Sequence, residues 1–301
     1  MTARFVFLVH PLVEPARRIL AVRTFRPGVA LGLRRADPLG DVAEITRLTF
    51  AGVEGVVMGV PMLPEELLAD QELALRAMER AVQVAAPVQF VGLGSVLSVV
   101  AGRGSALQEA CGLPVTTGNA ATAWAATSVV KQLVGERGVR RVGVLGGRAT
   151  VGKAIAGILA EQLAGVEVIV DPQDVRSCGL LVGAHTTGGT LQPSAYPQGI
   201  LVDVALPPTL SGPPAPGCEV YAGEAVSLPA GWRRDRWGAL FHLVAGYGRR
   251  RVYACLLEPL VALATGRPEP WAQGKRLDLA AVRAFGEAAD TLGLRPEVVR
   301  R

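Results

Sequence analysis

The chain of 301 residues, half of them hydrophobic, predicts a folded protein of about two domains and excludes a disordered chain. Its net charge of +5 lies mostly on arginine, and no aromatic platform or nucleic-acid motif accompanies the basic clusters, so we do not expect nucleic-acid binding. Every apolar run is shorter than the ~20 residues that span a bilayer, and no secretory leader is evident, so we expect a cytoplasmic protein.

The cysteines are far apart in the sequence and form no CxxC pair. In a reducing compartment each of them is expected to stay a free thiol. The histidines show no spacing that suits a metal, so we predict no metal site. The four cysteines are Cys111, Cys178, Cys218 and Cys255.

The N-terminal half predicts strands that alternate with helices. Two apolar runs separated by Ala51-Gly52-Val53-Glu54 are typical of a β-hairpin, and Pro64 followed by two glutamates is typical of a helix start. The predicted elements are a strand at 4–9, a helix at 14–23, hairpin strands at 45–50 and 55–60, a long helix from Pro64 to just before Pro87, and a buried strand at 88–91.

The C-terminal half alternates in the same way, which predicts a parallel, doubly wound sheet. Its predicted strands lie near 141–145, 166–170, 179–184, 200–204 and 219–222, and its helices at 120–136, 150–164, 248–265 and 279–294. The fold class is therefore α/β: an N-terminal α/β lobe completed by C-terminal helices, with a reduced Rossmann-like parallel-sheet domain. The predicted domains are 1–136, 137–240 and 241–301.

A glycine-rich turn joins a predicted strand to a predicted helix, and the N–H groups of such a turn can bind a diphosphate. Gly146 and Gly152 have the outer spacing of GxGxxG, and Asp171 ends the next strand. Asp171 favours NAD, whereas Arg148 would meet the 2′-phosphate of NADP, so the choice between the two cofactors stays open. The predicted cofactor-binding residues are Gly146, Gly147, Arg148, Thr150, Val151, Gly152 and Asp171.

Several segments, in one order along the chain, resemble the cyanobacterial-type long-chain fatty acyl carrier protein reductases, which form fatty aldehydes. Thr116-Thr117-Gly118-Asn119 and Ala254-Cys255 are the most specific matches. Others are Phe7-Leu8-Val9-His10, Leu63-Pro64-Glu65-Glu66-Leu67, Gly92-Leu93-Gly94-Ser95 and Phe285-Gly286-Glu287-Ala288.

The resemblance implies an NAD(P)H-dependent reductase of a fatty acyl thioester. Cys255 would attack the thioester, and a hydride from the nicotinamide would then release the aldehyde. The acyl group would be carried by coenzyme A or by an acidic acyl carrier protein. The residues that the resemblance implies for substrate binding are His10, Gly94, Ser95, Thr117 and Asn119.

The chain also departs from that family. Ala149 replaces a glycine of the turn, and too few residues separate Asp171 from Gly179 for the helix and strand that the family has there. The adenosine side of the cofactor site would be truncated. Two alternatives therefore stay open: a non-catalytic relative without the cofactor that binds an acyl or other small ligand, and an acyl transferase or thioesterase that keeps Cys255.

Overall fold

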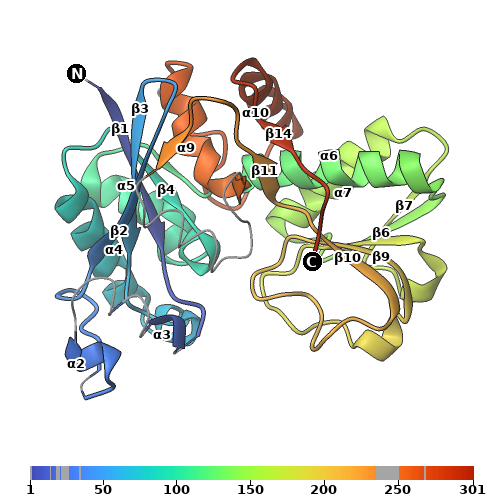
Figure 1. Ribbon diagram of the computed structural model, residues 1–301, viewed down its shortest axis with the longest axis horizontal. Coiled ribbons are helices and arrows are strands. Elements are labelled where there is room, and N and C mark those ends of the chain that lie inside the picture. The colour runs from blue at the N-terminus through green and yellow to red at the C-terminus, as the bar shows by residue number, and fades with distance from the viewer. Residues whose placement is uncertain are drawn as a thin grey trace. The chain divides into compact units, whose positions relative to one another are not determined.

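The computed structural model describes residues 2–13, 15–17, 21, 27–33, 35–234, 251–267 and 269–301. The chain forms two compact units (Figure 1). Unit 1 comprises Met1–Gly118, Pro229–Arg251 and Cys255–Lys275. Unit 2 comprises Asn119–Leu228, Val252–Ala254 and Arg276–Arg301.

Unit 1 is built on a six-stranded sheet of order β12-β2-β3-β1-β4-β5. β3, β1, β4 and β5 are mutually parallel, whereas β2 is antiparallel to β3 and forms the expected hairpin with it. The strands are β1 (Ala3–Val9), β2 (Ala43–Phe50), β3 (Val53–Gly59), β4 (Phe90–Leu93), β5 (Val115–Thr116) and β12 (Arg233–Arg234).

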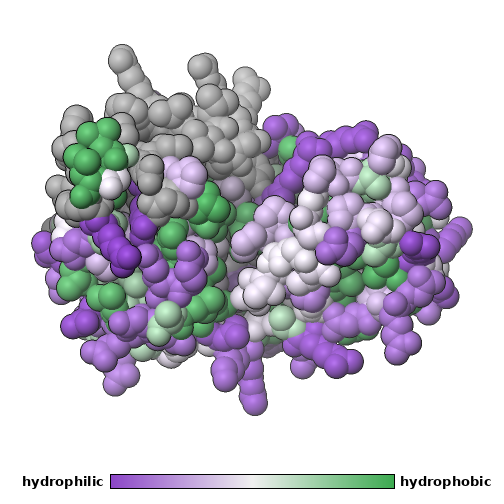
Figure 2. Space-filling view, turned by 90° about the horizontal axis from the view of Figure 1, so that it is seen from below, coloured by the Kyte–Doolittle hydropathy of each residue, from purple (hydrophilic) through white to green (hydrophobic). Residues whose placement is uncertain are grey.

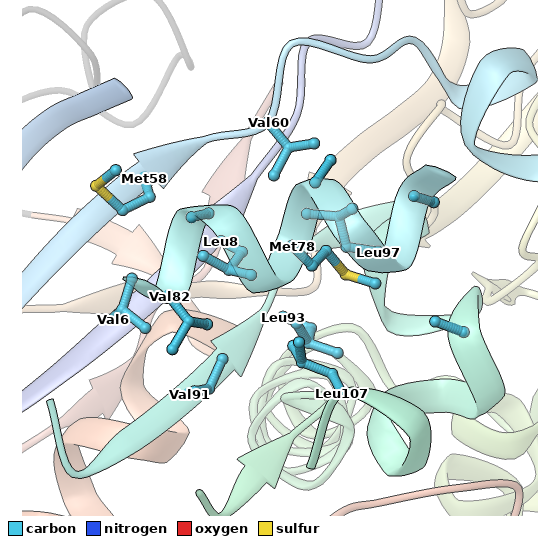
Figure 3. Packing of buried hydrophobic residues seen from close by; sticks show 14 of the residues in the cluster. Val6, Leu8, Met58, Val60, Met78, Val82, Val91, Leu93, Leu97 and Leu107 are labelled. Carbon is cyan, nitrogen blue, oxygen red and sulfur yellow. The ribbon is translucent and has the colours of Figure 1, made fainter. Parts of the chain in front are cut away.

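Successive side chains of each strand point to opposite faces of this sheet, so each face presents apolar side chains. Helices cover both faces. Val6 and Leu8 lie on the face covered by α3 (Pro64–Ala69), α4 (Gln71–Ala85) and α5 (Ser105–Cys111), in the core of Figure 3. Gly92 lies on the opposite face, where α9 (Ala254–Ala264) packs. A Cβ added at Gly92 would lie 2.9 Å from Pro259 Cγ of α9 and 2.6 Å from Phe7 Cδ2. Glycine at this position therefore lets α9 approach the sheet closely.

Two predicted helices of unit 1 differ from the structure. The helix expected from Pro64 is broken at Asp70, whose backbone is not helical and whose side chain accepts the Leu73 N–H at 2.9 Å to cap α4. The helix expected at 248–265 begins at Ala254 within the described residues, because Arg251–Tyr253 form strand β13, and residues 248–250 lie outside them. Most of the helix expected at 14–23 lies outside the described residues.

Unit 2 contains a second six-stranded sheet of order β15-β10-β9-β8-β6-β7. All its strands are parallel except β15, which is antiparallel to β10. The strands are β6 (Arg141–Leu145), β7 (Glu167–Val170), β8 (Leu180–Gly183), β9 (Gln198–Asp203), β10 (Gly217–Ala222) and β15 (Val299–Arg300). A small three-stranded sheet joins β13 to β11 (Ala225–Ser227) and β14 (Arg295–Pro296).

Three helices of unit 2 pack against one another: α6 (Asn119–Arg137), α7 (Thr150–Gln162) and α10 (Leu279–Thr291). Trp124 of α6 meets Phe285 of α10 edge-on, with ring centroids 5.4 Å apart. The segments that link β7 to β8, β8 to β9 and β9 to β10 contain only short 3₁₀ turns and loops. The domain is therefore a reduced doubly wound fold, as the short spacing after Asp171 predicted.

A buried carboxylate holds the last of these loops. Asp203, 1% exposed at the end of β9, accepts hydrogen bonds from the N–H groups of Ala205 (3.1 Å) and Thr209 (2.9 Å), and from the Thr209 hydroxyl (2.7 Å). Burial raises the pKa of Asp203, although these hydrogen bonds oppose the rise. Because its backbone and hydroxyl partners are all local, Asp203 is a structural anchor of the proline-rich loop.

Hydrophilic and apolar residues are interspersed on the face of the molecule that Figure 2 shows. Several large apolar side chains are exposed, among them Leu31 at 71% and Leu33 at 78%. Within the described ranges, none of the helices combines the length and apolar character needed to cross a membrane.

The expected fold class is confirmed: the chain is α/β, with two lobes that each contain a sheet built mainly of parallel strands. Of the two C-terminal helices, α9 belongs to unit 1, whereas α10 packs on α6 and α7 in unit 2. The three predicted domains, 1–136, 137–240 and 241–301, stay a prediction, since a compact unit is not by itself shown to fold alone.

Candidate functional site

The parallel strands of unit 1 bring several predicted site residues to one edge of the sheet. β1, β4 and β5 are adjacent and parallel, so their C-terminal ends lie together. Ligands of open α/β sheets bind at this edge. The residues that follow the strands, with Cys255 of α9, form what we call the strand-end cluster: His10, Gly94, Ser95, Thr117, Gly118 and Cys255.

His10 is enclosed at the end of β1. Its Nδ1–H donates to the Pro11 carbonyl at 3.0 Å, and its Nε2 accepts the Val96 N–H at 3.3 Å. Burial lowers the pKa of His10 to about 4, although the Pro11 hydrogen bond and nearby Glu65 oppose the shift. The imidazole is therefore neutral near pH 7, and both its nitrogens bind the protein's own backbone.

Ser95 occupies a strained turn at the end of β4. Its φ is +50°, a value that residues other than glycine rarely adopt, and it begins the 3₁₀ turn Ser95–Ser98. The Ser95 Oγ is buried and has no hydrogen-bond partner among the described residues. The Gly94 N–H donates to the Leu8 carbonyl at 2.9 Å, which fixes the turn against β1. The hydroxyl of Ser95 is thus a polar group that the described fold does not satisfy.

Thr116 and Thr117 are buried at the end of β5 and bind the segment that follows α9. The Ala272 carbonyl accepts the Thr117 N–H at 3.0 Å and the Thr116 hydroxyl at 3.1 Å. The single Thr116 hydroxyl proton is shared between this carbonyl and Glu258 Oε1, and the hydroxyl oxygen accepts the Gly118 N–H at 3.2 Å. These bonds fix the backbone that leads to Gly118.

Cys255 lies against this backbone at the start of α9. A Cβ added at Gly118 would lie 2.4 Å from Cys255 Cβ and 2.8 Å from its Cα, so the two residues are in direct contact. The structure thereby places Cys255 beside Gly118. Asn119, the next residue, is half-buried and begins α6 in unit 2.

Glu258 is a residue that the sequence reasoning missed. It is fully buried one helical turn after Cys255 and is bound by the Thr116 hydroxyl. The sequence did contain a signal for it, namely one glutamate within an otherwise apolar helix. Such a carboxylate needs a polar partner when it is buried.

The glycine-rich turn of unit 2 has the predicted strand–turn–helix context. Gly146 has a φ of +72° and follows β6, and Gly152 lies in the first turn of α7. The Asp171 carboxylate binds this turn. Its Oδ1 accepts the Gly146 N–H at 2.7 Å and the Gly147 N–H at 3.1 Å. Two N–H groups that would face a diphosphate are therefore already bonded within the chain.

The other predicted cofactor residues surround this closed turn. Arg148 is exposed, and its Nε lies 3.6 Å from Asp171 Oδ2. Thr150 and Val151 begin α7, and Gly152 packs so closely that an added Cβ would lie 2.3 Å from the Gly146 carbonyl oxygen. Gly152 therefore has a packing role that needs no ligand.

A groove of about 550 Å³ in unit 1 is lined by other residues, among them Gln108, Glu109, Glu269 and Gln273. None of the predicted site residues lines it. Over the described ranges, no group of three or more His, Cys, Asp and Glu side chains is suited to hold a metal ion. The predicted absence of a metal stays a prediction.

Comparison with known proteins finds a similar protein that is named as an enzyme. The chain is 27% identical over 347 residues to a protein named aminotransferase PigE, from Serratia sp. (strain ATCC 39006). The match covers 96% of this chain and 39% of that protein, so the chain spans well under half the length of this relative. No family model matches the chain.

Solved structures give weaker likenesses. An extracellular ligand-binding receptor from Rhodopseudomonas palustris HaA2 has a TM-score of 0.39 and 12% identity, over 96% of this chain and 88% of that one. A protein of Rhodopseudomonas palustris (strain CGA009), Rp1789, has a TM-score of 0.37 and 13% identity, over 94% and 88% of the two chains. TM-scores this low do not establish a shared fold.

The match to an aminotransferase corrects the expected identity and function. The resemblance to the acyl carrier protein reductases was wrong, and with it the aldehyde-forming reduction of an acyl thioester. The two alternatives, a cofactor-free binding relative and a Cys255 acyl transferase or thioesterase, are not supported either. The expectation of NAD or NADP was also wrong, and the physical reason visible in the chain is that Asp171 binds the N–H groups of the turn.

An aminotransferase relative implies pyridoxal phosphate (PLP), which binds a lysine as a Schiff base in an enclosed site. This chain has three lysines, and all are exposed. Lys131 donates to Gln162 Oε1 at 2.9 Å on the surface of unit 2, Lys153 lies in the first turn of α7, and Lys275 follows the α9 segment. The residues of this chain therefore do not fit PLP, and no step is derived through it.

Proposed function

We propose that this chain is a portion of a transferase-type enzyme that serves amino-group transfer without holding PLP itself. The observation that carries the proposal is the match of 96% of the chain to 39% of a protein named an aminotransferase. All three lysines, Lys131, Lys153 and Lys275, are exposed, which supports the proposal that the chain does not hold PLP itself. The PLP lysine would lie outside the residues of this chain.

We assign contact with the substrate to the strand-end cluster of unit 1. Three features support this assignment. The cluster lies at the edge of a parallel sheet where ligands bind. Ser95 offers a hydroxyl without a partner among the described residues, and Cys255 offers a half-buried thiol. In the cytoplasm, where we place the protein, a reducing environment keeps this thiol free.

Treatment with PLP and then with borohydride tests the absence of a PLP lysine. We expect no stoichiometric pyridoxyl-lysine in the 301-residue chain, because an exposed lysine lacks the enclosed, low-dielectric site that stabilises the Schiff base. Mass spectrometry of the reduced protein measures the adduct. The Lys131→Ala, Lys153→Ala and Lys275→Ala variants should each show the same weak, scattered labelling as the wild type. One full adduct that disappears in a single variant would overturn the proposal.

Alkylation with iodoacetamide tests the place of Cys255. We expect the Cys111, Cys178 and Cys218 thiols to react slowly, because burial raises their pKa and so lowers their thiolate fraction, and we expect Cys255 of the strand-end cluster to react ahead of them. Peptide mapping after short exposure measures each rate. Cys111 is the matched comparison, since it too is half-buried.

Ligand protection then links the thiol to amino-group transfer. A panel of primary amines, amino acids, aldehydes and 2-oxo acids is added before the alkylation. One class should slow the modification of Cys255 and leave that of Cys111 unchanged, because only Cys255 lies in the strand-end cluster. Equal rates at Cys255 with every compound would remove the assignment of substrate contact to this cluster.

A further inference from the structure

We propose that the Gly146–Ala149 turn of unit 2 carries its own anion, the Asp171 carboxylate, and is thereby closed to phosphate groups. The inference is independent of the proposed function. It rests on the two hydrogen bonds from the Gly146 and Gly147 N–H groups to one oxygen, Asp171 Oδ1, at 2.7 and 3.1 Å. Successive N–H groups that converge on one point form a concavity that binds anions.

The sheet register places the carboxylate in this concavity. β7 pairs in parallel with β6, so Asp171 follows β7 beside the turn that follows β6. The Asp171 N–H donates to the Val144 carbonyl at 2.9 Å, and its φ of +47° turns the chain at this point. The carboxylate is therefore held at the turn by backbone contacts as well as by its side chain.

The turn is rigid on its remaining sides. A Cβ added at Gly146 would lie 2.9 Å from the Ala184 carbonyl, and one added at Gly147 would lie 2.7 Å from Val170 Cγ1. The Ala149 N–H donates to the Gly146 carbonyl at 2.9 Å, which closes the turn itself. The two N–H groups therefore keep their direction whichever anion they meet.

The N–H groups, and not Arg148, hold the carboxylate. The Arg148 side chain is 88% exposed and its Nε lies 3.6 Å from Oδ2, and a pair in such solvent contact contributes little. N–H groups bonded to an ionised oxygen are stronger partners than those bonded to a neutral one. A phosphate that enters would have to displace this carboxylate and would be repelled by it, so the wild-type turn excludes phosphate.

Removing the carboxylate should open the turn. We expect Asp171→Ala to be less stable than the wild type and to regain stability when inorganic pyrophosphate is added, because the external anion replaces the lost one. Calorimetric titration should give affinity for pyrophosphate at least about tenfold higher in Asp171→Ala than in the wild type. Thermal unfolding with and without pyrophosphate gives the second readout.

Two further variants separate this effect from a general loss of charge. Asp174→Ala removes a nearby exposed carboxylate that caps the 3₁₀ turn Val175–Ser177 through the Arg176 N–H, and it should behave as the wild type toward pyrophosphate. Asp171→Asn keeps an acceptor oxygen without the charge, so it should fold even if the alanine variant does not, and bind pyrophosphate with intermediate affinity. Wild-type protein that binds pyrophosphate as tightly as Asp171→Ala, or Asp171 variants that bind none, would overturn the proposal.

Discussion

Replacing Gly118 with alanine is expected to lower the free energy of unfolding by roughly 2 to 5 kcal/mol. Gly118 has a φ of +71°, which costs an L-residue about 1 to 2 kcal/mol. The new Cβ would also lie 2.4 Å from Cys255 Cβ and 3.0 Å from its carbonyl oxygen, so the start of α9 or the end of β5 must move. Urea unfolding of the variant and the wild type measures the difference.

Gly112→Ala is the matched control for this change. Gly112 also belongs to unit 1 and has a φ of +66°, but nothing lies within 4 Å of an added Cβ. Its replacement should cost only the backbone strain of about 1 to 2 kcal/mol. Equal losses in the two variants would mean that α9 yields to the new methyl group, and would argue against a rigid contact between Gly118 and Cys255.

The sequence predicted most strands correctly because their apolar runs are bounded by glycine, proline or charge. The hairpin at 45–60 and the β6–α7 unit have such boundaries, and both were found at the predicted places. The break at Asp70 was missed because the apolar face continues from α3 into α4, so the periodicity shows no interruption. β13 was missed for a similar reason: Arg251–Tyr253 are as compatible with a helix as with a strand, and their pairing is non-local.

The candidate site was predicted in part. The resemblance grouped His10, Ser95 and Thr117 as substrate-binding residues, and the structure shows that they follow adjacent parallel strands. Their role in binding stays a prediction. The turn that includes Gly146 was also placed correctly, yet its occupant was not. Spacing shows where Asp171 lies along β7, but a ribose-binding carboxylate and one that bonds its own turn have the same sequence pattern. Side-chain direction decides between them, and only the three-dimensional structure shows it.

Unit 1 should lose stability as the pH falls from 6.5 toward 4, because the protein holds His10 in its neutral form. The pKa of His10 is lowered from 6.5 to about 4 by burial, so below pH 6.5 the unfolded chain binds a proton that the folded chain does not. The stability that neutral His10 permits is therefore fully present above pH 6.5. It is lost as the pH falls to the pKa that His10 has in the folded protein. Each pH unit corresponds to about 1.4 kcal/mol, so the loss reaches about 3 kcal/mol near pH 4.

His10→Gln is the variant that isolates this effect, since glutamine can donate to Pro11 and accept from Val96 without titrating. Urea unfolding at pH 7, 5.5 and 4.5 should show the wild type losing stability relative to the variant as the pH falls. Asp203 has the opposite effect on stability as the pH falls, because its raised pKa makes the folded chain take up a proton before the unfolded chain does. Both proteins contain Asp203, so its effect cancels in the difference between them. Parallel curves for the wild type and His10→Gln would show that His10 is hydrated in the folded protein, and that the end of β1 is open to water.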